Sequence, residues 1–170
     1  MKVILINPFP ENASGINEAT IEPPLGLGYI ARVLEDANCN VQIIDANVLG
    51  IPASGVIDLV ERFEPDMIGI SANIVTWPSS LNLIRLLHQR DKKSRIIIGG
   101  PYPTSLSEYS LRNSDAEAVV IGEGEQTVGE IAENIRNRRH PYRNVPGVAF
   151  KEDGNIIINV AGIDRLILAE

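Results

Sequence analysis

The residues best suited to chemistry in this sequence are small and polar, and they follow five apolar runs. Ser71 can offer a hydroxyl group, and Gly99 with Gly100 would expose bare backbone to a flat ligand. A turn or capping role for these residues remains an open alternative. Ligands bind beyond the carboxyl ends of the strands in open α/β sheets, so these positions predict a binding site. The runs end at Asn7-Pro8, Asp45, Ser71-Ala72-Asn73, Gly99-Gly100-Pro101 and Gly122-Glu123-Gly124-Glu125.

Acid–base or nucleophilic catalysis has little support in the sequence. Its 2 histidines, His88 and His140, stand at no readable spacing from a nucleophile. Glu123 and Glu125 fall where a helix should begin, where carboxylates also favour the helix dipole. The single cysteine, Cys39, excludes an internal disulfide and a cysteine-based iron–sulfur site in this stretch. We therefore predict ligand binding, with no catalytic residue and no metal-ligating side chain.

Length and composition limit the classes of protein to consider. The 170 residues are 44% hydrophobic and 22% charged, which suits one globular domain with a sizeable core. The net charge of −7 argues against a nucleic-acid or anionic-membrane partner, because phosphate binding needs a basic surface. No apolar run approaches the ~20 residues of a membrane span, and no signal peptide is evident. We expect a cytoplasmic location.

A helix over residues 24–35 is the first element expected to position the site. Pro24 suits a helix start, and Leu27, Ile30 and Leu34 form one apolar stripe. Gly26 and Gly28 each cost roughly 1 kcal/mol in a helix, which makes sense if something large approaches that backbone. A long polar loop over residues 7–22 precedes the helix, and loops of that length are often functional.

Strands and helices alternate along the rest of the chain. Five βα units in a row predict a doubly wound parallel sheet covered on both faces. Residues 67–71 and 95–99 are continuously apolar and should be central, whereas residues 41–45 carry polar positions and should form an edge. This pattern favours the flavodoxin-like (Rossmann-like) five-stranded order 2-1-3-4-5. Helices are expected from about Pro52, from about Pro78, over 106–111 and from about Gly124.

The end of the chain differs from the βα pattern. Asp153-Gly154 between two apolar runs predicts a β-hairpin over residues 145–159. The segment from there to Glu170 has no clear period and is expected to be a linker or a mobile end. We accordingly divide the chain into an α/β domain, residues 1–140, and a hairpin with linker, residues 141–170.

One motif is typical of a dinucleotide-binding site. Gly26, Gly28 and Ala31 fit the G-x-G-x-x-A pattern, and Asp45 follows at about the distance expected for a ribose-binding acid. That motif belongs in the tight turn directly after the first strand, whereas a long loop separates Ile6 from Gly26 here. A nucleotide-binding Rossmann-like domain is therefore the weaker alternative.

Several of these motifs, in this order, resemble the N-terminal cobalamin-binding domain of B12-dependent radical SAM enzymes. That group includes anaerobic magnesium-protoporphyrin IX monomethyl ester oxidative cyclases and methyltransferases. The resemblance covers nearly the whole chain, including the hairpin. The motifs are Pro23 to Ala31, Ser71, Ile98 to Thr104, and Val120 to Glu125.

The resemblance implies a cobalamin site at the carboxyl ends of the strands. The corrin would lie across the top of the sheet, near the loop 7–24, with its nucleotide tail entering beside Ser71, Gly99, Gly100 and Gly122. The cofactor-binding residues implied are Asn7, Pro24, Leu25, Gly26, Ser71, Ala72, Asn73, Thr76, Gly99, Gly100, Pro101, Gly122, Glu123 and Gly124. A leucine in place of Gly100 is then expected to abolish binding while the fold survives.

Two departures from related families refine the expectation. Other cobalamin domains carry an Asp-x-His-x-x-Gly motif after the first strand, where this chain reads Asn7 to Asn12 without histidine. His88 and His140 are expected at the opposite end of the sheet, so cobalamin should bind base-off with no histidine ligand. The CxxxCxxC motif of a radical SAM domain is absent. S-adenosylmethionine and a 4Fe-4S cluster would therefore belong to a further domain of the same polypeptide.

An interaction or regulatory module that keeps the fold without a ligand is the alternative from another class. Apolar side chains near the top of a sheet can face a partner protein as well as a cofactor. The residues that motivate this alternative are Phe9, Ile16, Ile21, Leu25 and Trp77.

Overall fold

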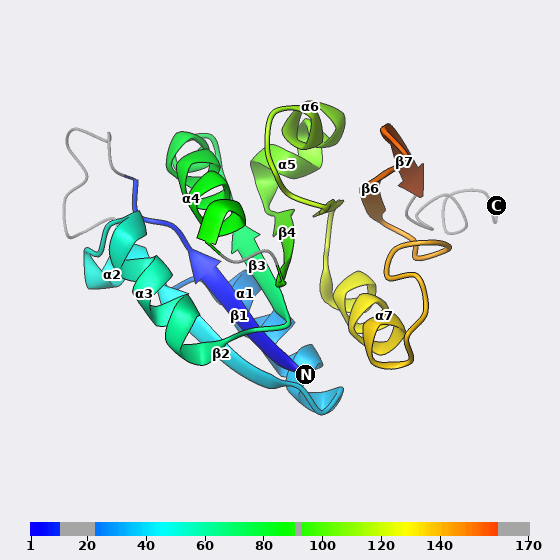
Figure 1. Cartoon of the computed structure of the whole chain (residues 1–170), viewed down its shortest axis with the longest axis horizontal. Helices are drawn as coiled ribbons and strands as arrows, with labels where there is room; N and C mark the ends of the chain where they lie inside the picture. The colour runs from blue at the N-terminus through cyan, green and yellow to red at the C-terminus, as the bar shows by residue number, and fades with distance from the viewer. Residues whose placement is uncertain (11–22, 91–92, 160–170) are drawn as a thin grey trace, which may run out of the picture.

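The computed structural model describes residues 1–10, 23–90 and 93–159. These residues form one seven-stranded sheet with helices on both faces (Figure 1). The strands are β1 Lys2–Asn7, β2 Asn40–Asp45, β3 Met67–Ser71, β4 Arg95–Gly99, β5 Ala118–Val120, β6 Val148–Glu152 and β7 Asn155–Asn159. The helices are α1 Leu25–Asp36, α2 Ala46–Leu49, α3 Ala53–Phe63, α4 Trp77–Arg90, α5 Pro101–Ser105, α6 Ser107–Arg112 and α7 Glu125–Arg136.

The first five strands are parallel, and their order confirms the prediction. The sheet runs β2-β1-β3-β4-β5-β6-β7, with β3 paired to β1 on one side and β4 on the other. β2 has one neighbour in the described chain and carries exposed side chains, as its polar residues predict. The strand order reverses between β1 and β3, so the carboxyl ends of these two strands flank the switch point where α/β folds bind ligands.

The predicted count of five strands is wrong, because the C-terminal hairpin extends the same sheet. β6 pairs antiparallel with β5, with Val148 opposite Val120 and Phe150 opposite Ala118. β5 is a short, wholly buried strand that would otherwise leave an apolar edge unpaired. The predicted turn itself is present, since Asp153 and Gly154 both have the positive φ that a two-residue hairpin turn favours.

Side chains of each strand alternate between two cores. Val3 and Leu5 of β1 pack on the face covered by α1 and α7, together with Phe150 of the hairpin. Ile4 and Ile6 pack on the opposite face with residues of α3, α4 and α6. The period of two in the strands and the helical stripes thus produce two apolar layers around one sheet.

Two helical segments differ from the prediction in detail. The helix expected over 106–111 is preceded by a separate short helix, α5, and the break falls at Leu106, whose φ of −133° is not helical. α2 was not predicted. It forms because the Asp45 carboxylate accepts a hydrogen bond from the Val48 amide at 3.2 Å and so caps the helix start.

Parts of two predicted segments lie outside the described residues. They are residues 11–22 of the long loop and residues 160–170 of the tail. In the portion of the chain that the structure covers, none of the helices combines the length and apolarity required to cross a membrane.

Candidate functional site

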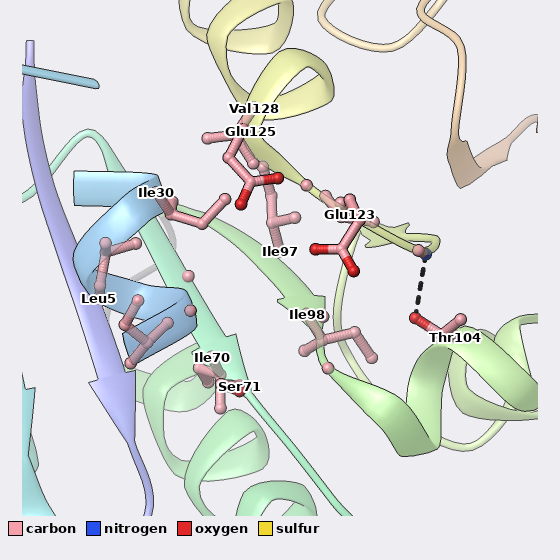
Figure 2. Close-up of a pocket in the computed structure, with 18 of the residues that line it drawn as sticks. Leu5, Ile30, Ile70, Ser71, Ile97, Ile98, Thr104, Glu123, Glu125 and Val128 are labelled. Carbon is pink, nitrogen blue, oxygen red and sulfur yellow. Dashed lines mark hydrogen bonds between the residues drawn. The ribbon is translucent and has the colours of Figure 1, made fainter. Parts of the chain in front are cut away.

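A cavity of about 420 Å³ opens at the carboxyl edge of the sheet, on the face covered by α1 and α7 (Figure 2). Its floor is made by strands β1, β3, β4 and β5, and its walls are α1 and the start of α7. The loop between β5 and α7 lies along the mouth. The predicted site residues that line the cavity are Gly26, Ser71, Gly99, Gly100, Pro101, Gly122, Glu123 and Gly124.

The other predicted residues lie near the same edge without lining the cavity. Pro24 caps α1, and Leu25 begins it with 69% of its surface exposed. The side-chain carboxamide of Asn7 donates a hydrogen bond to the Asp45 carboxylate at 2.9 Å, and this bond joins the ends of β1 and β2. Ala72 is buried and donates its amide to the Gly99 carbonyl at 2.9 Å. Contact of these residues with a ligand stays a prediction.

Asn73 and Thr76 shape the turn that leads from β3 into α4. The Asn73 carboxamide oxygen accepts hydrogen bonds from the amides of Val75 and Thr76, both at 2.9 Å. The Thr76 hydroxyl accepts in return from the Asn73 amide at 3.0 Å. This reciprocal bonding satisfies backbone donors at the helix start and holds the turn in one shape.

The glycines at the edge of the sheet serve different purposes. Gly100 has φ +96° and ψ 178°, a region nearly restricted to glycine, and an added Cβ would lie 2.6 Å from the Ala72 carbonyl oxygen. This geometry argues against the expectation that leucine at Gly100 would leave the fold intact, because the side chain would strain the backbone whether or not a ligand is bound. An added Cβ at Gly99 would make ordinary contact with Val120 at 3.8 Å, whereas one at Gly26 would meet nothing within 4 Å beyond its own helix. Gly26 therefore leaves space that the described protein does not fill, and Gly99 tolerates a small side chain.

Gly122 and Gly124 form the mouth of the cavity beside α5 and α7. The Gly122 amide donates to the Thr104 hydroxyl at 3.1 Å (dashed in Figure 2), which ties the β5–α7 loop to α5. A Cβ on Gly124 would lie 3.0 Å from Val120 and 3.1 Å from Ile30, so this glycine allows α1 and the start of α7 to approach.

Sequence reasoning missed the depth of the cavity. Gly69 lies in the middle of β3, and a Cβ there would lie 2.8 Å from the Leu5 side chain, which crosses it. A lone glycine inside an apolar strand signals such a close approach and could have identified this position. The lining residues not predicted as cofactor-binding are Leu5, Leu27, Ile30, Met67, Gly69, Ile70, Ile97, Ile98, Thr104, Val120, Glu125 and Val128.

A family model, the B12 binding domain, matches residues 15–132. The chain belongs to the B12-binding domain family. It is 29% identical to an uncharacterized methyltransferase of Pyrococcus horikoshii, an alignment that covers 92% of this chain and 34% of that protein. It is 30% identical to the anaerobic magnesium-protoporphyrin IX monomethyl ester cyclase of Synechocystis, with 92% of this chain and 32% of that protein covered.

The fold of this B12-binding domain has a close counterpart among solved structures. The cobalamin-dependent S-adenosylmethionine radical enzyme OxsB, with aqua-cobalamin and S-adenosylmethionine bound, superimposes with a TM-score of 0.80. The two chains are 22% identical, and the match covers 94% of this chain and 22% of OxsB. This likeness establishes the shared fold. The chain spans about a third of the length of the curated relatives it matches.

The charged side chains around the cavity of the B12-binding domain are carboxylates. Glu123 and Glu125 direct their carboxylates toward the cavity from the β5–α7 loop and the start of α7 (Figure 2). Among the described residues that line it, none is lysine, arginine or histidine. The site therefore favours groups that donate hydrogen bonds over multiply charged anions.

Both histidines lie away from this cavity. His140 follows α7 and contacts Glu152 at 2.9 Å, beyond the end of β5 that is opposite the cavity mouth. His88 is exposed near the end of α4, roughly 16 Å along the helix from Trp77 at its start.

The apolar surface at the carboxyl edge differs from the set predicted. Trp77 is only 6% exposed and stacks on Tyr102 with ring centroids 4.7 Å apart, so its assignment to a partner-facing surface is wrong. Leu25 is exposed as predicted, and Ile74, at 71% exposed, and Val75 join it. Ile16 and Ile21 lie outside the described residues.

Proposed function

We propose that this B12-binding domain holds cobalamin in a base-off form, with the nucleotide tail in the cavity and the corrin above the carboxyl edge. The observation that carries the proposal is a cavity beside the switch point, lined by small residues, in which Gly26 leaves open space for a ligand. Family membership supplies the identity of that ligand. Ligand sites in proteins commonly combine such an apolar interior with a few polar groups at fixed positions.

The residues at the mouth fit the periphery of a corrin. Cobalamin carries many side-chain amides, and the carboxylates of Glu123 and Glu125 can accept hydrogen bonds from them. The Ser71 hydroxyl can bond to the same periphery or to the single phosphate of the tail. When bound, cobalamin would supply a cobalt centre that carries a methyl group or assists radical chemistry.

The nucleotide-binding alternative has less support from the same residues. Gly26 and Gly28 lie in the first turn of α1 and not in a tight turn after β1. Asp45 already bonds to Asn7 and caps α2, and it does not line the cavity. A pyrophosphate would also meet two carboxylates and, among described lining residues, no cationic side chain.

We further propose that the parent polypeptide is a radical SAM enzyme of the methyltransferase or cyclase type. The relatives named above are about three times as long as this chain. In this proposal a further domain holds S-adenosylmethionine and a 4Fe-4S cluster, while residues 1–159 bind and orient cobalamin. No residue of this domain is assigned a catalytic role.

Titration with hydroxocobalamin under reducing conditions tests cobalamin binding. We expect a changed absorption spectrum and a raised melting temperature. The bound Co(II) form should give an electron paramagnetic resonance spectrum without nitrogen superhyperfine splitting, because neither histidine lines the cavity. Nitrogen splitting would contradict the base-off pose. An unchanged spectrum and melting temperature at high micromolar cobalamin would contradict binding altogether.

A complete absence of cobalamin binding would favour the alternative that the domain is an interaction or regulatory module. The exposed side chains of Leu25, Ile74 and Val75 at the carboxyl edge are the observation that supports this alternative. Recovery of the domain with a protein partner, but never with a corrin, would be its signature.

A further inference from the structure

The cavity is polar at its mouth and apolar toward its floor. The polar side chains that line it, Ser71, Thr104, Glu123 and Glu125, come from the carboxyl edge of the sheet or the segments just beyond it. Along β3 the cavity continues from Ser71 down to Met67, which lies opposite Arg95 at the start of β4. Four residues of strand span about 13 Å, so the cavity reaches well below its polar mouth.

The deeper part is apolar. Leu5, Met67 and Ile97 line it from the strands, and Ile30 of α1 and Val128 of α7 continue this apolar lining up to Gly124 at the mouth. Strand pairing in register, Leu5 with Gly69 and Gly69 with Ile97, engages the backbone donors and acceptors of this floor within the sheet. Among the described lining residues, the side chains at this depth are aliphatic apart from the thioether of Met67, which is at most a weak hydrogen-bond acceptor and donates nothing.

We propose that this cavity selects among cobamides by the polarity of the lower base. It should take a benzimidazole-type base and discriminate against a purine such as adenine, an inference that rests on the proposed placement of the nucleotide tail. A benzimidazole released from cobalt buries a single free ring nitrogen and gains from its apolar edge. Adenine adds further ring nitrogens and an amino group, each of which would lose water without finding a partner.

The affinities of the wild-type domain for three corrinoids test this proposal. Affinities are measured by absorption titration for cobalamin, for its adenine-containing analogue and for cobinamide, which lacks the nucleotide. All three are used in the Co(I) state, where no base is bound to cobalt and detachment of the base contributes nothing to the difference. We expect cobalamin to bind at least about tenfold more tightly than the adenine analogue, and more tightly than cobinamide.

The possible results distinguish selection of the lower base from the underlying proposal that the domain binds cobalamin. Equal affinities for cobalamin and the adenine analogue would overturn base selection and leave cobalamin binding intact. Cobinamide binding as tightly as cobalamin would show that the tail does not use the cavity, and it would overturn both the selection and the pose. Failure of all three corrinoids to bind would overturn the proposed function itself.

A matched pair of variants locates the selection. Val128→Thr places a hydroxyl on the α7 wall at nearly constant volume, and it should narrow the preference for cobalamin severalfold. Val56→Thr makes the same change at a buried position of α3, on the opposite face of the sheet, and should leave the preference unchanged. Melting temperatures show that both variants are folded. If the affinity ratio between cobalamin and the adenine analogue changes equally in both variants, or in neither, the base does not lie against the Val128 wall.

Discussion

At the scale of single residues, the glycines divide into those that the fold requires and those that leave space. Gly100 belongs to the first class, since the Ala72 backbone occupies the position that its side chain would take. Gly26 belongs to the second, because nothing in the described protein lies within 4 Å of its missing Cβ. Only a glycine of the second class can report on ligand binding when it is replaced.

Gly26→Leu should weaken cobalamin binding at least about tenfold, whereas Gly28→Leu should not change it. Both glycines lie in the first turns of α1 with open space around the missing Cβ, but only Gly26 lines the cavity. Leucine is favoured over glycine in helices by roughly 0.5–1 kcal/mol, so both variants should remain folded. Absorption titration gives the two affinities, and equal values for the two variants would count against the cavity as the site.

Gly100→Ala should destabilise the fold by about 1–3 kcal/mol, while Gly99→Ala should have little effect. The difference arises from backbone conformation and space, because a Cβ clashes with backbone at Gly100 and makes only ordinary contacts at Gly99. Urea denaturation of both variants without ligand measures this. Equal midpoints would show that the Gly100 backbone can relax.

At the scale of elements, the hairpin β6–β7 is fastened to the rest of the domain at its far end. Glu152 accepts a hydrogen bond from Arg143 at 2.9 Å and contacts His140 at the same distance. The hydrogen bond from Arg143 is the main cause of a Glu152 pKa below its usual value of 4.5, and the charge of His140 adds to it. The segment after α7 is thereby joined to the end of β6.

Glu152 should make the stability of the domain depend on acid pH. A carboxylate whose pKa is lowered by folding stabilises the native state above its unfolded-state pKa, and this contribution is lost as the pH falls through the lowered value. The wild type should therefore melt above Glu152→Gln at pH values over 4.5, and the gap should close below pH 4.5. Melting temperatures across this range measure the effect, and a gap independent of pH would contradict it.

At the scale of the whole molecule, the carboxyl edge is only half of an enclosing site. Leu25, Ile74 and Val75 are exposed around the region where the corrin is proposed to lie. Tight small-molecule sites bury most of the ligand surface, whereas one sheet edge can cover a single face of a corrin. In the parent enzyme proposed above, a further domain would supply the second wall.

The chain of 170 residues should therefore bind cobalamin only weakly, with a dissociation constant of about 1 µM or higher. If the proposed parent enzyme is used in its place, binding should be at least about tenfold tighter, because its further domain would bury the second face of the corrin. Parallel absorption titrations of the two proteins give the comparison. Submicromolar affinity of the short chain would refute the need for a second wall.

The sequence by itself determined the order of the elements and several of the residues that line the cavity. Continuous apolar runs placed β3 and β4 at the centre, and Asp153-Gly154 predicted the hairpin turn, because these features depend on local conformation and burial. Small residues at strand ends predicted the mouth of the cavity, since parallel strands bring their carboxyl ends to one edge.

Only the tertiary structure decided where the hairpin pairs and how deep the cavity is. A turn motif predicts that two strands pair with each other, but it does not predict which further strand the hairpin joins. Here that strand is the buried β5. Alternation in a strand defines two faces without saying which helices cover them, so the contribution of Leu5 and Met67 could not be foreseen. The backbone clash that a side chain at Gly100 would cause likewise arises from a contact with Ala72, a neighbour brought close only by folding.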